Sequence, residues 1–262
     1  MAVRDIFIIS RGTKVVLMIT FLVSVIAVLT ALFYYGSINR SEDPRIETAL
    51  DLLVRYDALP YGYDLTGKLK LLDSAGSVFR SFPDYANSFE TGVIHNNKSS
   101  AFLVSALYDS SVTSPEKDIL LELAMTYADS SITVYRRWIE EWGHSGRVEV
   151  ERRIRMEMLP SDRAFEGRNY EKLIARRAKN QLTAQVETPR RLSVSLSNKG
   201  IIYRHMQKYD SAAGCFSEAL SLWKNNRVAK SNFNVLMGGD PVKPGLIESL
   251  FPPDRKKTEI NN

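Results

Sequence analysis

The sequence has very few of the residues that build disulfide frameworks and metal sites. Its 262 residues include one cysteine, Cys215, and three histidines, His95, His144 and His205. A single cysteine excludes an intrachain disulfide, and no histidine stands in an H-E-x-x-H or comparable ligand spacing. The composition therefore predicts no metal and no other cofactor, and it leaves the stability of the fold to packing.

The sequence also lacks a complete phosphate-binding loop, although one stretch comes close. The segment "YGYDLTGKLK" (61–70) has the glycine and lysine spacing of such a loop, but Leu69 stands where Ser or Thr would hold magnesium. Upstream, residues 45–58 repeat their apolar positions with a period near 3.6, which indicates a helix rather than the strand that feeds such a loop. We interpret the stretch as a connection between two helices, with Asp64 or Thr66 capping the second one.

The longest uncharged run lies near the start of the chain, at residues 15–35. A helix of this length spans roughly 31 Å at 1.5 Å per residue, which matches the apolar thickness of a bilayer. A cleaved signal peptide is the alternative, but its apolar region is usually about 7 to 15 residues long. The run ends instead on the aromatic residues Phe33, Tyr34 and Tyr35, which suit a membrane interface. The sequence predicts one uncleaved transmembrane helix over 15–35.

The basic residues around this run give its expected orientation. Arg4, Arg11 and Lys14 precede the run, whereas Arg40 and Arg45 follow it. Because basic residues favour the cytoplasmic side, we expect a single-pass protein with residues 1–14 in the cytoplasm. The body would then lie outside the cytoplasm, in the periplasm if the organism is bacterial.

Small residues recur on one face of the expected membrane helix. Thr20, Ser24, Ala27 and Ala31 follow one another at i, i+4, i+7 and i+11. Small side chains on one face allow another membrane helix to approach closely. The alternative is that these residues are ordinary for a membrane helix and mark no contact.

The rest of the chain alternates between periodic segments and short breaks. The periodic segments predict helices over 45–58, 67–82, 99–108, 116–142, 148–158 and 170–185, with one of the breaks at "VETPRR" (186–191). No hairpin signal or run of alternating strands is present, so we predict an all-α body. The expected organisation is a linker at 36–44, a helical domain at 45–186, a repeat with a terminal helix at 187–251, and a polar, disordered tail at 252–262.

The most informative pattern lies in "LSNKGIIYRHMQKYDSAAGCFSEALSLW" (196–223). Two helical faces are separated by a turn near 207–210, and their expected packing positions are Leu196, Gly200, Tyr203, Ala212, Phe216 and Ala219. Small residues let two antiparallel helices approach, while the aromatic residues fill the space beside them. The pattern over 192–224 resembles the tetratricopeptide repeat, although Lys199 and Lys224 replace its usual leucine and proline.

The resemblance implies a helical-hairpin array that works as a binding scaffold. Because one repeat cannot bury its own faces, the flanking helices would be degenerate repeats; the alternative is an irregular helical bundle. In this family the first helix of each pair lines a groove for peptides or partner subunits. Carried over to this sequence, that role gives Asn198, Ile201 and Arg204 as candidate partner contacts, unless they are ordinary solvated or inter-repeat positions.

Basic residues are concentrated in one part of the body. Residues 147–191 contain twelve Lys and Arg against seven Asp and Glu. The signs alternate along the segment, which is typical of a solvated helix face; a protein or membrane contact is the alternative. No aromatic-basic reader motif accompanies these charges, so we expect no nucleic-acid partner.

Two functions remain after this reading of the sequence. The first is a membrane-anchored adaptor without enzymatic activity, which docks other proteins as part of a cell-envelope assembly. Its membrane helix would lie in the bilayer in contact with other membrane helices. The second is a membrane-anchored enzyme whose acid and base groups meet only in the folded chain, with Glu122, Asp129 and Glu140 as candidates.

Overall fold

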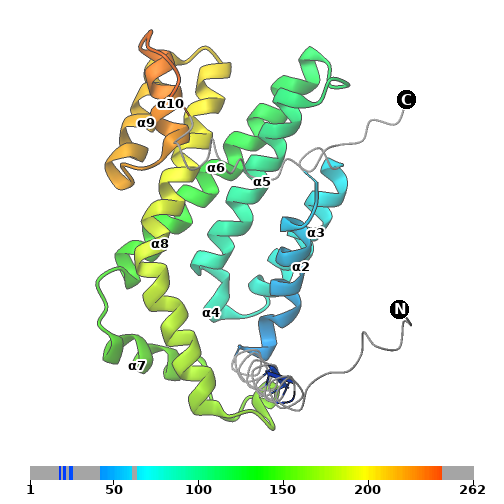
Figure 1. The fold of residues 1–262 in the computed structure, drawn as a ribbon, viewed down its shortest axis with the longest axis vertical. Helices are drawn as coiled ribbons and strands as arrows, with labels where there is room; N and C mark the ends of the chain where they lie inside the picture. Colours follow the sequence, from blue (N-terminus) through cyan, green and yellow to red (C-terminus); the bar gives the residue numbers. More distant parts are fainter. Residues whose placement is uncertain (1–17, 19, 22–23, 26–41, 61–63, 244–262) are drawn as a thin grey trace, which may run out of the picture.

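The computed structural model describes residues 18, 20–21, 24–25, 42–60 and 64–243 of the chain. Every regular element in these residues is a helix, as predicted (Figure 1). The elements are η2 Pro44–Ile46, α2 Glu47–Asp57, α3 Leu65–Arg80, α4 Pro83–Ala86, α5 Phe89–Tyr108, α6 Ser114–Trp142, α7 Arg147–Glu157, η3 Arg163–Phe165, α8 Tyr170–His205, α9 Tyr209–Leu222 and α10 Arg227–Leu236.

The long helices α5, α6 and α8 form the centre of the bundle (Figure 1). The α2–α3 pair packs against α5 on one side, while α7, α9 and α10 pack against α8 on the other. One apolar core joins α6 to the helices that follow it, a second lies among α2, α3 and α4, and a third fills the upper part of the α5–α6–α8 contact. The α8 helix is thus the element that connects the two sides of the molecule.

Polar residues at the helix starts explain where several helices begin. Asp64 accepts hydrogen bonds from the first turn of α3, Asn169 from that of α8 and Asn226 from that of α10. Thr113 and Glu116 form a capping box at the start of α6. Such caps satisfy the backbone N–H groups that a helix leaves unpaired at its first turn. The sequence-based expectation that Asp64 caps the helix after "YGYDLTGKLK" is therefore confirmed, although residues 61–63 lie outside the described part.

The predicted break at "VETPRR" is wrong, because α8 continues through Pro189. A proline inside a helix costs about 3 kcal/mol, so the sequence favoured a stop. Side-chain bonds on both sides of Pro189 hold the helix in place: Gln185 Nε2 donates to the carbonyl oxygens of Trp142 (2.6 Å) and Ser145 (2.8 Å), and Ser193 Oγ donates to that of Ala219 (2.7 Å). The expected boundary between 186 and 187 consequently falls inside one continuous helix.

The α5 helix begins at Phe89, ten residues before the predicted start at Ser99. Its first half buries polar side chains, among them Glu90, Thr91 and Lys98. A helix that places polar residues in the interior has no apolar period for the sequence to display. For that reason the pattern over 89–98 gave no helix signal.

The expected membrane helix can be compared with the structure only in part. Within the described residues, no helix has the length and apolar character needed to cross a bilayer. Most of 15–35 lies outside those residues, together with Ala27 and Ala31, whereas Thr20 and Ser24 are helical and exposed. Residues 1–14, 36–41 and 244–262 also lie outside the described part.

Candidate functional site

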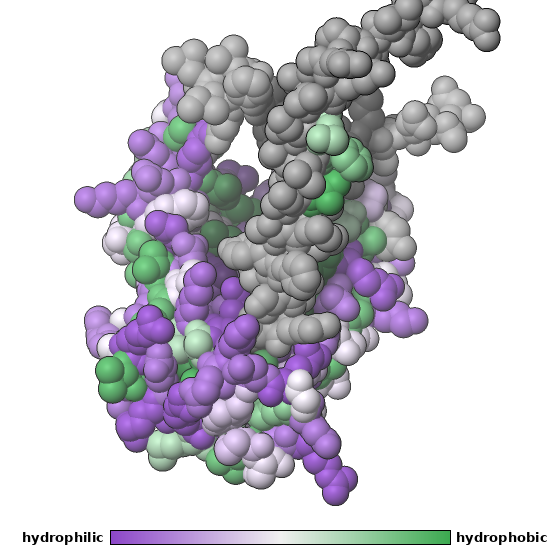
Figure 2. Space-filling model, turned by 60° about the horizontal axis from the view of Figure 1, so that its bottom comes forward, coloured by the Kyte–Doolittle hydropathy of each residue, from purple (hydrophilic) through white to green (hydrophobic). Residues whose placement is uncertain are grey.

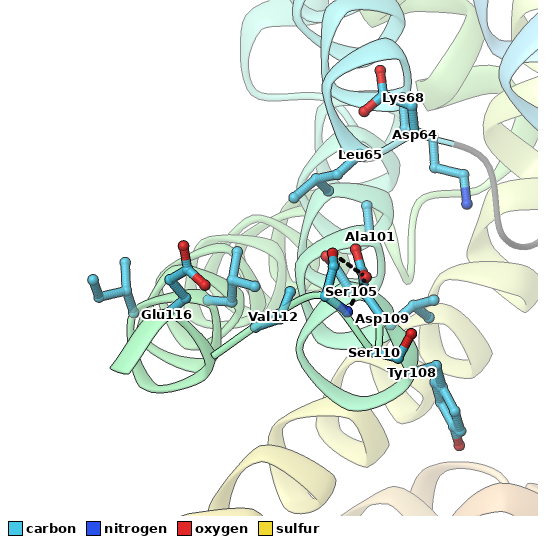
Figure 3. Close-up of a pocket in the computed structure, with 14 residues that line it drawn as sticks. Asp64, Leu65, Lys68, Ala101, Ser105, Tyr108, Asp109, Ser110, Val112 and Glu116 are labelled. Carbon is cyan, nitrogen blue, oxygen red and sulfur yellow. Dashed lines mark hydrogen bonds between the residues drawn. The ribbon is translucent and has the colours of Figure 1, made fainter. Parts of the chain in front are cut away.

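A groove of about 620 Å³ lies where the start of α3 meets the connection between α5 and α6. We call it the distal groove, because Figure 1 places the α5–α6 connection at the opposite end of the bundle from the start of α2. Figure 3 shows its labelled side chains: Asp64, Leu65 and Lys68 come from the start of α3, Ser105 and Tyr108 from the end of α5, Val112 from the α5–α6 connection and Glu116 from the start of α6. Two segments that are more than 30 residues apart in the sequence, the start of α3 and the α5–α6 turn, therefore build one surface.

The lining of the distal groove includes many apolar side chains. They are Leu65, Ala101, Val104, Val112, Ile119 and Leu120. Ala101 is buried, but Ile119 keeps 58% of its surface exposed, and Tyr108 at the edge keeps 72%. Large apolar side chains gathered at an exposed hollow are a common feature of surfaces that bind other proteins. The apolar lining of the distal groove could therefore pack against the apolar face of a segment from another protein.

Three carboxylates also line the distal groove, and each is held by its own neighbours in the chain. Asp64 accepts from the backbone N–H groups of Thr66 (3.1 Å) and Gly67 (3.0 Å). Hydrogen bonds from the hydroxyl and backbone N–H of Ser111 lower the pKa of Asp109. Hydrogen bonds from the backbone N–H and hydroxyl of Thr113 likewise lower the pKa of Glu116. Asp109 and Glu116 are consequently ionised at neutral pH, with their positions fixed by local turns and caps.

The same geometry explains why the stretch around Lys68 is not a phosphate loop. A phosphate loop presents free backbone N–H groups at the start of a helix. Here the N–H groups of Thr66 and Gly67 already donate to the carboxylate of Asp64. Lys68 lies within α3, and burial lowers the pKa of its ammonium group. The position that a phosphate would occupy is taken by a side chain of the protein itself.

The three candidate partner contacts from the repeat pattern do not line the distal groove. Asn198 is only 8% exposed, and its Nδ2 donates to Asn96 Oδ1 of α5 (3.2 Å), which corrects the expectation of an accessible contact. Ile201 is partly buried against the apolar cores. Arg204 lines a different groove, beside Tyr209 of α9. Because other helices pack on both sides of α8, little of the α8 surface that would line a repeat groove is left accessible.

The six expected repeat-packing residues lie at the contact between α8 and α9 and around it. Leu196, Gly200, Ala212, Phe216 and Ala219 are buried, and Tyr203 is partly buried against the same core. A Cβ atom on Gly200 would lie 2.5 Å from Cε1 of Phe216, which is too close for any side chain. Glycine is therefore what allows the ring of Phe216 to lie directly on the backbone of α8.

The carboxylates named for the enzyme alternative do not converge. Glu122, Asp129 and Glu140 are exposed on the single continuous helix α6. Eighteen residues separate the first from the last, which is about 27 Å along a helix axis. Asp129 forms an ion pair with Lys199 of α8 (2.6 Å). That expected site is wrong, because one straight helix cannot bring these three groups together.

A second polar cluster, which sequence reasoning missed, lies at the other end of the bundle. We call it the basal network; its members are Asp43, Arg45, Asp84, Tyr85, Glu90 and Arg177, all buried or nearly so. Arg45 Nη2 pairs with Asp43 (2.7 Å) and with Asp84 (2.6 Å), and the hydroxyl of Tyr85 donates to Asp43 (3.0 Å). Arg177 pairs with Glu90 and lies 4.2 Å from the ring centre of Tyr85.

The basal network fixes the start of the body to helices much later in the chain. Asp43 caps η2, which begins at Pro44, so the last two residues of the expected linker 36–44 belong to the packed fold. Glu42, one residue earlier, pairs with Arg176 of α8. Figure 2 brings this end of the molecule forward, and hydrophilic side chains cover most of the described surface that it shows. Apart from Arg45 and Asp43, which are two residues apart, these pairs join partners 39 to 134 residues apart, so no local pattern indicates them.

The chain was also compared with proteins that are already known. It matches no model of a known protein family, no curated protein and no solved structure.

Proposed function

We propose that this protein is a membrane-anchored helical adaptor. In this proposal residues 15–35 cross the bilayer with the body on the extracytoplasmic side, and the distal groove binds a segment of a partner protein within a membrane or cell-envelope assembly. The tetratricopeptide resemblance over 192–224 belongs to the same proposal, with the α8–α9 hairpin as a repeat-like unit of a binding scaffold. The observation that carries the proposal is the composition of the distal groove, which combines an exposed apolar lining with three carboxylates.

The chemistry of the distal groove defines the partner segment. The whole chain has a net charge of +5, yet the groove contains Asp64, Asp109 and Glu116 against one cation, Lys68. An acidic hollow on a basic protein favours a basic occupant, because charge complementarity guides encounter and fixes the register of a bound segment. The apolar lining favours an amphipathic helix, which places apolar side chains three or four residues apart into a groove. The expected ligand is an amphipathic helix with Lys or Arg along its edges.

The arrangement of anchor and groove suits an adaptor. The described body starts at Glu42, seven residues after the expected membrane helix. Arg45 of the basal network holds this start against α4 and against Asp162 at the N-cap of η3, and Glu42 holds it against α8. The α5–α6 connection, which lines the distal groove, lies at the other end of the bundle (Figure 1). A tether of this kind confines the groove to one layer near the membrane, which raises its effective concentration toward a partner in the same membrane.

The test is copurification from the native membrane with a matched pair of surface variants. Full-length protein, with 15–35 intact, is isolated gently, and the proteins that accompany it are identified and quantified by mass spectrometry. Ile119→Lys places a cation in the groove at a position that is 58% exposed, and Val148→Lys makes the same change at an 84% exposed position of α7. We expect Ile119→Lys to release a stoichiometric partner that Val148→Lys retains.

Two further readouts make the result specific. The wild-type protein should also bind the same partner more weakly at high salt, because ions screen exposed charge pairs. A synthetic basic amphipathic peptide from the released partner should bind the wild type and fail to bind Ile119→Lys. Equal retention of every accompanying protein by both variants would remove the distal groove from the proposed function.

A further inference from the structure

The last described helix, α10, has an apolar side that the described part of the chain leaves exposed. Val228 is 53% exposed and Val235 is 43% exposed. The two residues are seven positions apart, which places them on the same side of the helix, two turns from each other. A neighbouring side of α10 is packed, with Ala229 buried and Phe233 and Leu236 partly buried against the core.

This exposed side continues into a groove at the end of α10. The groove has a volume of about 670 Å³ and lies among the end of α8, the start of α9 and the end of α10. Its lining includes Val235, Met237 and Tyr209, and the last two are 58% and 55% exposed. Val228 and Val235 thus form one apolar strip along α10, which meets this groove at Val235 and which we call the α10 strip.

The chain after α10 turns back along this same side. Gly238 has a φ of +81°, a conformation that glycine adopts without strain and that ends the helix. The backbone N–H of Val242 then donates to Ser231 Oγ (3.2 Å), and Arg227 Nη2 donates to the carbonyl oxygen of Lys243 (2.9 Å). Ser231 lies between Val228 and Val235 along the helix. Residue 243 is therefore held at the first turn of α10, beside the α10 strip.

The sequence that follows has the matching chemistry. Residues 244–251 read "PGLIESLF", with apolar side chains at Leu246, Ile247, Leu250 and Phe251. A spacing of i, i+1, i+4 and i+5 places these side chains on one face of a single helical turn. Proline precedes and follows the group, at 244 and 252, and prolines suit the start and the end of a short helix.

The distances also agree. The nine residue steps from Arg227 to Leu236 cover about 14 Å of helix axis. Eight residues reach about 12 Å as a helix and at most about 28 Å when extended. A segment that starts at residue 243 can therefore cover Val228 and Val235 in either conformation.

We propose that residues 246–251 bind the α10 strip of the same chain. The bound segment would cover Val228 and Val235, so that α10 would be packed on this side too and would no longer be the outermost helix. The distal groove is a separate surface, so this proposal stands or falls independently of the proposed function.

Crosslinking of the full-length protein in detergent tests the contact directly. In a Cys215→Ser background, Val235→Cys is combined with Leu250→Cys and treated with a short bismaleimide. We expect an intrachain crosslink, seen as a linked peptide pair in the monomer band after digestion and mass spectrometry. The control pair, Val148→Cys with Leu250→Cys, should give none, because Val148 lies on α7. A crosslink only between two chains, or equal yields for both pairs, would overturn the proposal.

Labelling of a single cysteine gives an independent test. Val235→Cys in the Cys215→Ser background is reacted with a maleimide in the full chain and in a chain that carries serine at 246, 247, 250 and 251. The substituted tail should raise the labelling rate of Val235→Cys severalfold while leaving that of Val148→Cys unchanged. An unchanged rate at Val235→Cys would show that the tail does not cover the α10 strip.

Discussion

The two ends of the bundle hold their charged groups in different ways. In the basal network Arg45 pairs with Asp84 and Arg177 pairs with Glu90, and these partners are 39 and 87 residues apart. In the distal groove Asp64, Asp109 and Glu116 bind groups only two or three residues away. The basal network joins distant parts of the chain. The local hydrogen bonds of the distal groove fix the position of each carboxylate and leave it accessible. A fixed end and an accessible end are what an anchored adaptor requires.

The largest expected effect comes from breaking the basal network. Arg45→Ala leaves Asp43 and Asp84 buried without their cation, and loss of one partner of a buried pair costs about 3–5 kcal/mol of unfolding free energy. Thermal and denaturant unfolding of the full-length protein in detergent, followed by circular dichroism, measures the loss. Arg55→Ala, an exposed residue of α2, is the control and should change stability little. Equal stability of the two variants would mean that the basal network does not fix the base of the bundle.

An intermediate effect is expected from the apolar contact between α8 and α9, which belongs to neither charged cluster. Gly200→Leu forces a side chain against Phe216, where even a Cβ atom would lie 2.5 Å from the ring. Overpacking of this kind usually costs about 1–3 kcal/mol, and occasionally more. Gly214→Leu on the neighbouring helix α9 is the matched control, because a Cβ atom there meets nothing within 4 Å. The same unfolding measurement decides the matter, and an unchanged melting temperature for Gly200→Leu would contradict the close packing of α8 on α9.

The smallest effect on stability is expected in the distal groove, and it should depend on pH. The hydrogen bonds from Thr113 lower the pKa of Glu116 below its ordinary value of 4.5 in the folded state. Such a group stabilises the fold above its unfolded pKa, and the contribution disappears as the pH falls through the folded pKa. Glu116→Gln should therefore be slightly less stable than the wild type at pH 7 and equally stable in strong acid. Unfolding curves from pH 7 down to pH 2 test this, with Glu122→Gln on the same helix as the control.

The sequence predicted most helices because their causes are local. The cap at Asp64 and the apolar periods of α2, α3 and α6 are all visible within one or two helical turns. The contact of Gly200 with Phe216 was also readable, because both residues belong to one hairpin. Where the interior of a helix is polar, as in the first half of α5, the local pattern gave no signal.

By itself the sequence determined the helical class, the approximate positions of most helices and the hairpin of α8 and α9, since these depend on propensity, capping and spacing between near neighbours. Only the tertiary structure decided the rest. It carried α8 through Pro189 by bonds from Gln185 and Ser193 to distant carbonyl groups. It also brought Arg45 to Asp84, and the start of α3 to the α5–α6 connection. Such contacts join residues that are far apart in the sequence. They form only when the whole chain has folded, so no pattern among neighbouring residues predicts them.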